Sequence, residues 1–229
     1  MATSGTATFD MNLTEYVEEA FERAGMEMRT GYDLRTARRS MGIMFADWAN
    51  RGINMWTIDQ ESQLLVQGTA TYTLAVDTVD VLEHVIRINS GVAATQSDMT
   101  ISRISVSTYS SIPNKLTQGR PIQILVNRLA SGPTATLWPV PDGVNTYYLV
   151  YWRLRRLEDP GTGVNTADIP FRFIPVMVSG LAYYLAMKYP ECAPRIPMLK
   201  EMYDQDWDIA AGEDREKASV RFVPRRMVI

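Results

Sequence analysis

The residue types that most often perform acid–base, nucleophilic or metal chemistry are scarce in this chain. It contains one histidine, His84, and one cysteine, Cys192. A zinc site needs several such ligands, and a serine or cysteine triad needs a histidine beside its nucleophile. His84 falls in a segment with the pattern of a β-strand, where we expect it to pack or to face solvent. The sequence therefore predicts no metal, no cofactor and no catalytic residue.

Carboxylates are more abundant, and one group of them resembles a calcium-binding loop. Asp204, Asp206 and Asp208 have the spacing that opens such a loop. The glycine and the final glutamate of the loop are replaced here by Ile209 and Arg215, so we expect these aspartates to lie on the solvent side of a helix. A carboxylate pair for glycoside hydrolysis remains open, because the distance between acidic side chains cannot be read from the sequence.

Arginines gather in the run Arg153–Leu157, RLRRL. In a strand, Arg153 and Arg155 would share one face and Arg156 the other. Contact with phosphates is one interpretation; we favour a solvated strand end that leads into the acidic Glu158. The whole chain carries 23 basic and 26 acidic residues, a net charge of -3, so its surface as a whole is not built to coat nucleic acid.

The final segment, residues 219–229, mixes arginines with apolar side chains. A tail that stays in solvent is usually less apolar. A solvated tail and a segment that docks on a partner surface both remain open. The residues that we expect to dock are Arg221, Phe222, Val223, Pro224, Arg225 and Arg226.

The elements that position these residues begin with two N-terminal helices. Apolar residues recur at helical spacing over residues 13–24, where either Asn12 or Thr14 could cap the helix and Gly25 would end it. A second apolar stripe starts at Leu34 and ends at Trp48, which predicts a longer amphipathic helix. The opposite face of this second helix carries Arg35, Arg38, Arg39 and Asp47.

A corner at Gly52 follows the second helix, and two tryptophans, Trp48 and Trp56, flank it. Gly52 stands where a left-handed residue would close the helix. Trp56 would pack the outgoing chain back onto the helix and bury roughly 150 to 250 Å². We therefore predict a structural hinge formed by Trp48, Gly52 and Trp56.

From about residue 62 the pattern changes to that of β-structure. The segment Leu64–Leu74, LLVQGTATYTL, favours a hairpin about Gln67-Gly68. Helical periodicity returns after a loop at residues 159–165, where Asp168 could cap a helix, and a last helix is expected from about Pro197 to Lys217. The apolar run over residues 169–187 is interrupted by an arginine, two prolines and a glycine, so we expect a buried helix and no membrane span.

The predicted fold class is α+β: a helical bundle formed by N- and C-terminal helices, with an inserted small antiparallel β-domain and an extended C-terminal tail. The predicted boundaries are residues 1–62 for the N-terminal helices, 63–157 for the β-domain, 158–218 for the C-terminal helices and 219–229 for the tail. Because terminal helices on either side of an insertion pack together, the two helical segments should share one core.

Several segments, taken in order, resemble a known family. They are DWANRGINMW, LLVQGTATYTL, DTVDVLEHVIRI, PIQILVN, LWPVPDG, PFRFIPVMVSGLAYYLAMKYP and SVRFVPRR. This order is similar to that of the head-to-tail adaptor (connector) proteins of short-tailed bacteriophages, the tail accessory factors related to the adaptor of phage P22. The resemblance extends over residues 12–226.

The resemblance implies a structural virion protein that is not an enzyme. Such an adaptor forms a ring of twelve copies that docks under the portal protein after DNA packaging, extends the DNA channel and provides the attachment surface for the tail nozzle protein. It implies docking on the portal through residues 219–229, and double-stranded DNA that passes through the lumen without sequence-specific contact.

The resemblance also implies a location in the neck of the virion, between head and tail. During assembly we expect the protein in the host cytoplasm, and we expect no membrane partner. The N-terminus lacks the pattern of a signal peptide, which fits that expectation. The alternative function that the sequence leaves open is a virion-associated peptidoglycan hydrolase carried in the tail.

Overall fold

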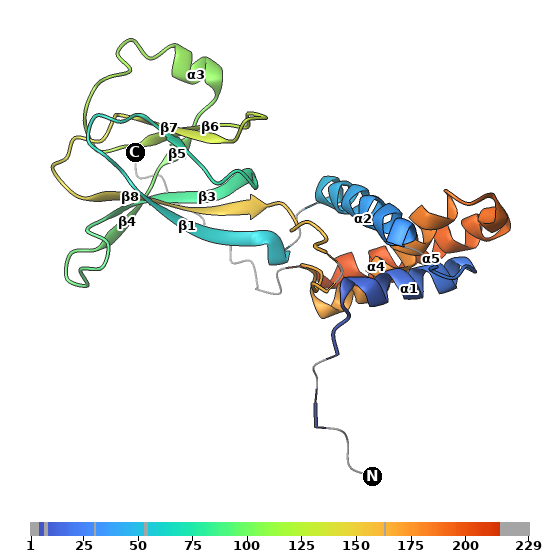
Figure 1. Ribbon diagram of the computed structural model, residues 1–229. Helices are drawn as coiled ribbons and strands as arrows, with labels where there is room; N and C mark the ends of the chain where they lie inside the picture. The colour runs from blue at the N-terminus through green and yellow to red at the C-terminus, as the bar shows by residue number, and fades with distance from the viewer. Residues whose placement is uncertain (1–4, 7–8, 30, 53–54, 163, 216–229) are drawn as a thin grey trace. The chain divides into compact units, whose positions relative to one another are not determined.

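A computed structural model describes residues 5–6, 9–29, 31–52, 55–162 and 164–215. Within these ranges the fold is mixed α+β, with five α-helices and two four-stranded sheets (Figure 1). The chain divides into two compact units. We call the described residues up to Met55 and from Glu158 onward the helical unit, and Trp56–Leu157 the β unit. The predicted docking tail, residues 219–229, lies outside the described residues.

The helical unit is organised around α4, whose residues are apolar almost all round and are therefore buried on most sides. Three other helices, α1, α2 and α5, pack against it (Figure 1). The helices of this unit are α1 (Leu13–Ala24), α2 (Gly31–Arg51), α4 (Ile174–Ala186) and α5 (Ile196–Glu213), with short 3-10 turns η2 (Phe171–Phe173) and η3 (Pro190–Arg195). None of the helices in the described ranges is long and apolar enough to span a bilayer.

Of the two caps predicted for α1, Asn12 and Thr14, the structure has Asn12. The Asn12 side chain accepts a hydrogen bond from the Glu15 backbone N–H, and the Glu15 carboxylate accepts one from the Asn12 N–H, a reciprocal capping box. The predicted cap at Asp168 is wrong. The 3-10 turn η2 and then α4 begin only after Pro170, too far along the chain for Asp168 to reach, and its carboxylate instead accepts from the Glu158 backbone N–H at 3.1 Å.

The β unit contains two sheets that share one apolar core. One sheet has the strand order β1-β8-β3-β4, formed by β1 (Ile58–Leu64), β8 (Tyr147–Arg155), β3 (Thr78–Ile88) and β4 (Ser97–Thr100). The other has the order β2-β7-β6-β5, formed by β2 (Thr71–Thr73), β7 (Thr134–Trp138), β6 (Gln123–Asn127) and β5 (Ser102–Arg103). A short helix, α3 (Val106–Ser110), and the 3-10 turn η1 (Met55–Thr57) complete the elements.

The predicted hairpin over residues 64–74 is wrong. Strand β1 pairs with β8, and β2 pairs with β7 in the other sheet. The turn at Gly68 is held by a hydrogen bond from its N–H to the Pro141 carbonyl, so here the chain crosses between sheets. A turn signal indicates where a strand ends but does not select its partner. The sheets are also not wholly antiparallel, because β5 and β6 pair in parallel.

Candidate functional site

The scarce reactive residues belong to different units, with the half-buried His84 in the β unit and the buried Cys192 in the helical unit. Both ring nitrogens of His84 on β3 are buried without a hydrogen-bond partner among the described residues, and burial lowers the pKa of the imidazole. Cys192 is buried, and burial raises the pKa of its thiol, which disfavours a reactive thiolate. Asp204 lies within the continuous helix α5 and contacts Lys200 at 2.6 Å. In the described part of the chain, no three His, Cys, Asp or Glu side chains are placed to hold a metal.

Trp48, one of the predicted hinge residues, is fully buried in the helical unit. Its indole N–H donates a hydrogen bond of 2.8 Å to the Tyr203 hydroxyl, which joins α2 to α5. Burial raises the pKa of Tyr203 to about 12. The rings of Phe45, Phe173 and Trp207 lie 5.5 to 5.7 Å from the Trp48 ring. Trp48 therefore connects three elements of the helical core.

The predicted stop at the corner is confirmed, because α2 ends at Arg51. Gly52 follows with φ of 152°, a conformation that L-residues rarely adopt. Beyond it, the Met55 N–H donates to the Asp214 carboxylate at 2.9 Å, so the outgoing chain is tied to the end of α5. Trp56 is half-buried in η1, at the start of the β unit. The hinge itself remains a prediction.

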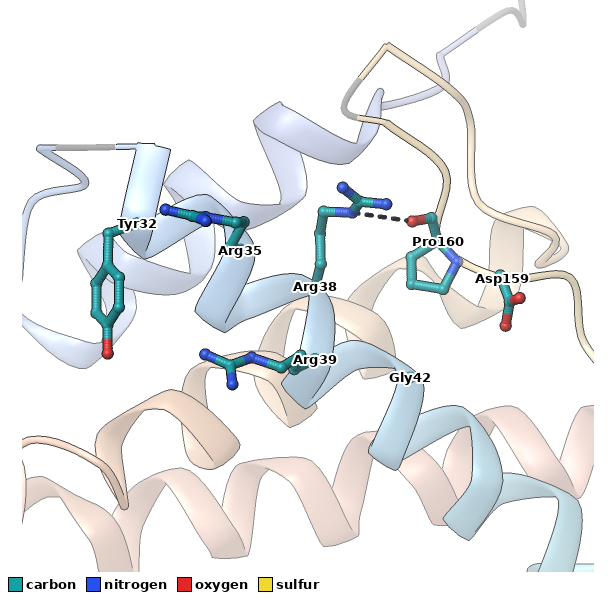
Figure 2. Close-up of a pocket in the computed structure, with 7 residues that line it drawn as sticks. All are labelled: Tyr32, Arg35, Arg38, Arg39, Gly42, Asp159 and Pro160. Atoms are coloured by element: carbon teal, nitrogen blue, oxygen red, sulfur yellow. Dashed lines mark hydrogen bonds between the residues drawn. The ribbon is translucent and has the colours of Figure 1, made fainter.

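A surface pocket of about 640 Å³ is formed where the first half of α2 meets the loop that leads into the C-terminal helices. We call it the arginine pocket (Figure 2). Arg35 and Arg39 extend from α2 on the side of Tyr32, whereas Arg38 extends toward the loop and donates to the Pro160 carbonyl at 3.3 Å. The pocket is lined by Tyr32, Arg35, Arg38, Arg39, Gly42, Asp159 and Pro160.

The arginine pocket has a net positive charge, because three arginines and only one carboxylate, Asp159, are among its lining residues. No carboxylate among the described residues forms an ion pair with Arg35, Arg38 or Arg39. Lys188 adds a cation nearby, since its ammonium donates to the Thr36 carbonyl at 3.0 Å, and burial followed by the charge of Arg39 lowers the pKa of Lys188. The pocket can therefore bind an anionic group.

A second surface carries the opposite charge. The exposed side of α1 lines a pocket of about 310 Å³ together with Phe9, Asp10 and Met11. We call the carboxylates of α1 at this surface, Glu15, Glu18, Glu19 and Glu22, the acidic face. Glu15 is engaged in the capping box and Glu19 contacts Arg23 at 2.8 Å, whereas Glu18 and Glu22 have no cationic partner among the described residues.

The arginine run on β8 has a structural role at Arg153. This side chain is only 8% exposed, and its guanidinium lies 2.7 Å from Asp77, 3.4 Å from Glu61 and 3.6 Å from Asp59. The favoured interpretation of a solvated strand end is therefore wrong for Arg153 and holds for the exposed Arg156. Three carboxylates already neutralise Arg153, which leaves it unsuited to phosphate binding.

The sequence identified the three arginines of α2 only as the polar face of a helix. Their role in a pocket depends on Pro160, more than a hundred positions along the chain from Arg38. One signal was present: Arg35 and Arg39 are one helical turn apart, and so are Glu18 and Glu22. Such like-charged pairs are unfavourable in an isolated helix.

Comparison with known proteins adds one assignment. A protein-family model described as "SU10 adaptor protein" matches residues 11–226, which include both units. A comparison with curated proteins gave no match.

Proposed function

Because the chain belongs to the SU10 adaptor protein family, we propose that it is the subunit of a phage head-to-tail adaptor ring. The family is one of phage structural proteins, so the protein is a structural component of the virion. The ring docks under the portal protein after DNA packaging, extends the DNA channel and offers its far side to the tail nozzle protein. The family match over residues 11–226 is the observation that carries this proposal.

The helical unit suits the body of such a ring. Its core is cross-connected, because α4 packs against α1, α2 and α5 while the Trp48–Tyr203 hydrogen bond joins α2 to α5. A rigid body of this kind would let twelve copies keep one channel diameter. Double-stranded DNA would pass through the lumen without sequence-specific contact, which a net charge of -3 favours over tight binding.

We place the portal contact in the C-terminal segment, residues 219–229. Arginines and apolar residues are mixed in this segment, a composition that suits binding to a partner surface better than free solvation. The docking residues are Arg221, Phe222, Val223, Pro224, Arg225 and Arg226. Assembly takes place in the host cytoplasm, and the mature position is the neck between head and tail.

The test of this docking is sedimentation of the purified chain with the portal ring of the same phage. The full chain should co-sediment with the portal, whereas a chain that ends at Ala218 should remain in the supernatant. A full-length variant with Arg221, Arg225 and Arg226 changed to alanine should bind at least tenfold more weakly, because charge-assisted contacts are lost.

The matched control removes three exposed arginines outside the tail, Arg29, Arg120 and Arg128. It should co-sediment like the unaltered chain. If the chain that ends at Ala218 binds the portal as tightly as the full chain, docking through residues 219–229 is refuted, and the contact must lie elsewhere on the protein.

We further propose that Trp48, Gly52 and Trp56 form the hinge between the helical and β units, with one tryptophan anchored in each unit. Gly52→Ala tests it, because an added Cβ would have no atom within 4 Å and would disturb only the φ of 152°. Ring yield on the portal should fall, whereas Gly31→Ala, with equal space and no positive φ, should have no effect. Equal yields for both variants would exclude the hinge.

The alternative function is that of a peptidoglycan hydrolase. A peptidoglycan hydrolase carried in the tail would lose activity on cell-wall material when one carboxylate is replaced. The family match favours a structural role over such an enzyme, so the portal experiment comes first.

A further inference from the structure

We infer that the arginine pocket of one copy receives the acidic face of α1 from a neighbouring copy, and that this contact repeats around the ring. The inference rests on the proposed ring and adds to it the residues that join adjacent copies. Its central pairs are Arg35 and Arg39 on one copy with Glu18 and Glu22 on the next.

The arginine side of this contact has three arginines and one carboxylate, Asp159, in its lining, and so it keeps a net positive charge among the described residues. Arg35 and Arg39 are exposed and form no ion pair among the described residues. They are four residues apart on α2, about 6 Å along the helix axis. Like charges at this spacing repel each other, and Lys188 adds a further cation beside Thr36. A pair of carboxylates at the same spacing would relieve this repulsion.

The acidic side offers that spacing. Glu18 and Glu22 are also four residues apart, both are exposed, and no cation among the described residues contacts either carboxylate. Two parallel or antiparallel helix surfaces with equal axial spacing can form both ion pairs at once. A planar guanidinium binds a carboxylate through two parallel hydrogen bonds, which adds geometric selectivity to the attraction.

Apolar contact is available beside both charged surfaces. Tyr32, 61% exposed, lies at the arginine pocket, and Phe9, 65% exposed, lies at the acidic face. Aromatic residues with exposed rings are enriched at protein interfaces, because they bury a large area at little cost in conformational entropy. The two surfaces thus combine complementary charge with an aromatic side chain on each.

A second copy fits these surfaces better than a nucleic acid does. The pocket and the acidic face are on different helices, α2 and α1, and share no lining residue, so one copy presents two distinct complementary patches. A contact between two different patches is heterologous, and heterologous contacts close into rings when the rotation permits. A phosphate backbone would satisfy the arginines but would leave the carboxylates of Glu18 and Glu22 without a partner.

The experiment reverses the charge of each surface in a separate variant and then mixes the two variant proteins. The first variant carries Arg35→Glu with Arg39→Glu, so the pairing positions on both of its surfaces are acidic. The second carries Glu18→Arg with Glu22→Arg, so these positions are basic on both surfaces. Neither should form rings on the portal alone, because like charges meet at every interface, which should weaken each contact at least tenfold. Ring formation is measured by electron microscopy and by the sedimented mass.

A mixture of the two variants should form rings again. Acidic copies would alternate with basic copies in equal amounts, and twelve positions allow such alternation because the number is even. A chain with all four substitutions should also assemble, since its charges are reversed but still complementary. The matched control, Arg120→Glu with Arg128→Glu on the β unit, should assemble like the unaltered chain.

The outcomes separate this inference from the proposed function. If the unaltered chain forms rings on the portal and both double variants do so equally well, the inference is refuted and the ring stands. It is also refuted if the variants fail alone and neither mixing nor the fourfold substitution restores assembly. If Arg35→Glu with Arg39→Glu reduces retention on duplex DNA and leaves assembly intact, the pocket binds phosphate. If the unaltered chain never joins the portal, the proposed function itself fails.

Discussion

The indole N–H of Trp48 donates a 2.8 Å hydrogen bond to the hydroxyl of Tyr203, and both side chains are almost completely buried. The two residues are on α2 and α5, so this bond connects the N-terminal and C-terminal parts of the helical unit. The guanidinium of Arg51 lies 4.9 Å from the Tyr203 ring centroid and covers the same cluster. The pair therefore contributes to the stability of the helical unit.

Tyr203→Phe should destabilise the chain by about 1–3 kcal/mol, because the buried indole N–H of Trp48 would lose its acceptor. Urea unfolding followed by circular dichroism measures the change. Tyr183→Phe is the matched control, since Tyr183 stacks on Tyr203 and no hydrogen bond of its hydroxyl is found among the described residues. Equal costs for the two variants would show that the Trp48 hydrogen bond contributes little.

The chain should lose stability between about pH 10 and pH 12. Burial raises the pKa of both Tyr16 and Tyr203 from 10.0 to about 12. Because the folded chain holds these phenol protons more tightly than the unfolded chain, the stabilisation is complete below pH 10 and is lost as the pH rises through the folded pKa. Melting temperatures across this range should fall less steeply for Tyr203→Phe, whereas Tyr32→Phe, at an exposed site, should follow the unaltered chain.

Gly180→Ala should destabilise the helical unit although alanine is the better helix former. An added Cβ would lie 2.6 Å from the Met44 sulfur and 2.7 Å from a ring carbon of Tyr203, so α4 could not approach its neighbours as closely. We expect a loss of about 1–3 kcal/mol from overpacking. Gly42→Ala, where nothing lies within 4 Å, should instead stabilise by about 0.5–1 kcal/mol. A higher melting temperature for Gly180→Ala than for the unaltered chain would refute this close packing.

Arg153→Leu should destabilise the β unit by about 1–3 kcal/mol, because Glu61 and Asp77 would lose the cation that they share, whereas Asp59 would keep its contact with Arg155 at 3.1 Å. Hydrogen exchange of the β8 backbone amides reports on this unit specifically. Arg87→Leu removes a more exposed pair with Asp98 and should cost less than about 1 kcal/mol. If the exchange rates of the β8 amides are unchanged in Arg153→Leu, the ion pairs of Arg153 contribute little to the stability of the β unit.

Elements whose signals are local could be predicted from the sequence. The start of α1 follows from Asn12 and Glu15, three residues apart, and the end of α2 follows from the glycine at position 52. The strand partners could not be predicted, because β1 pairs with β8, whose residues lie far along the chain. The same holds for the site: the sequence showed Arg38 on a polar helix face, but the pocket exists only because the fold brings Pro160 against it.

The adaptor function can be tested by light scattering, which gives the mass of the full chain in solution, alone and mixed with the portal ring of the same phage. An adaptor should add twelve copies to each portal ring, and the mass of the complex should not rise further when more of the chain is added. A mass that does not change when the portal is present would contradict the adaptor function, and activity on peptidoglycan would then become the alternative to test.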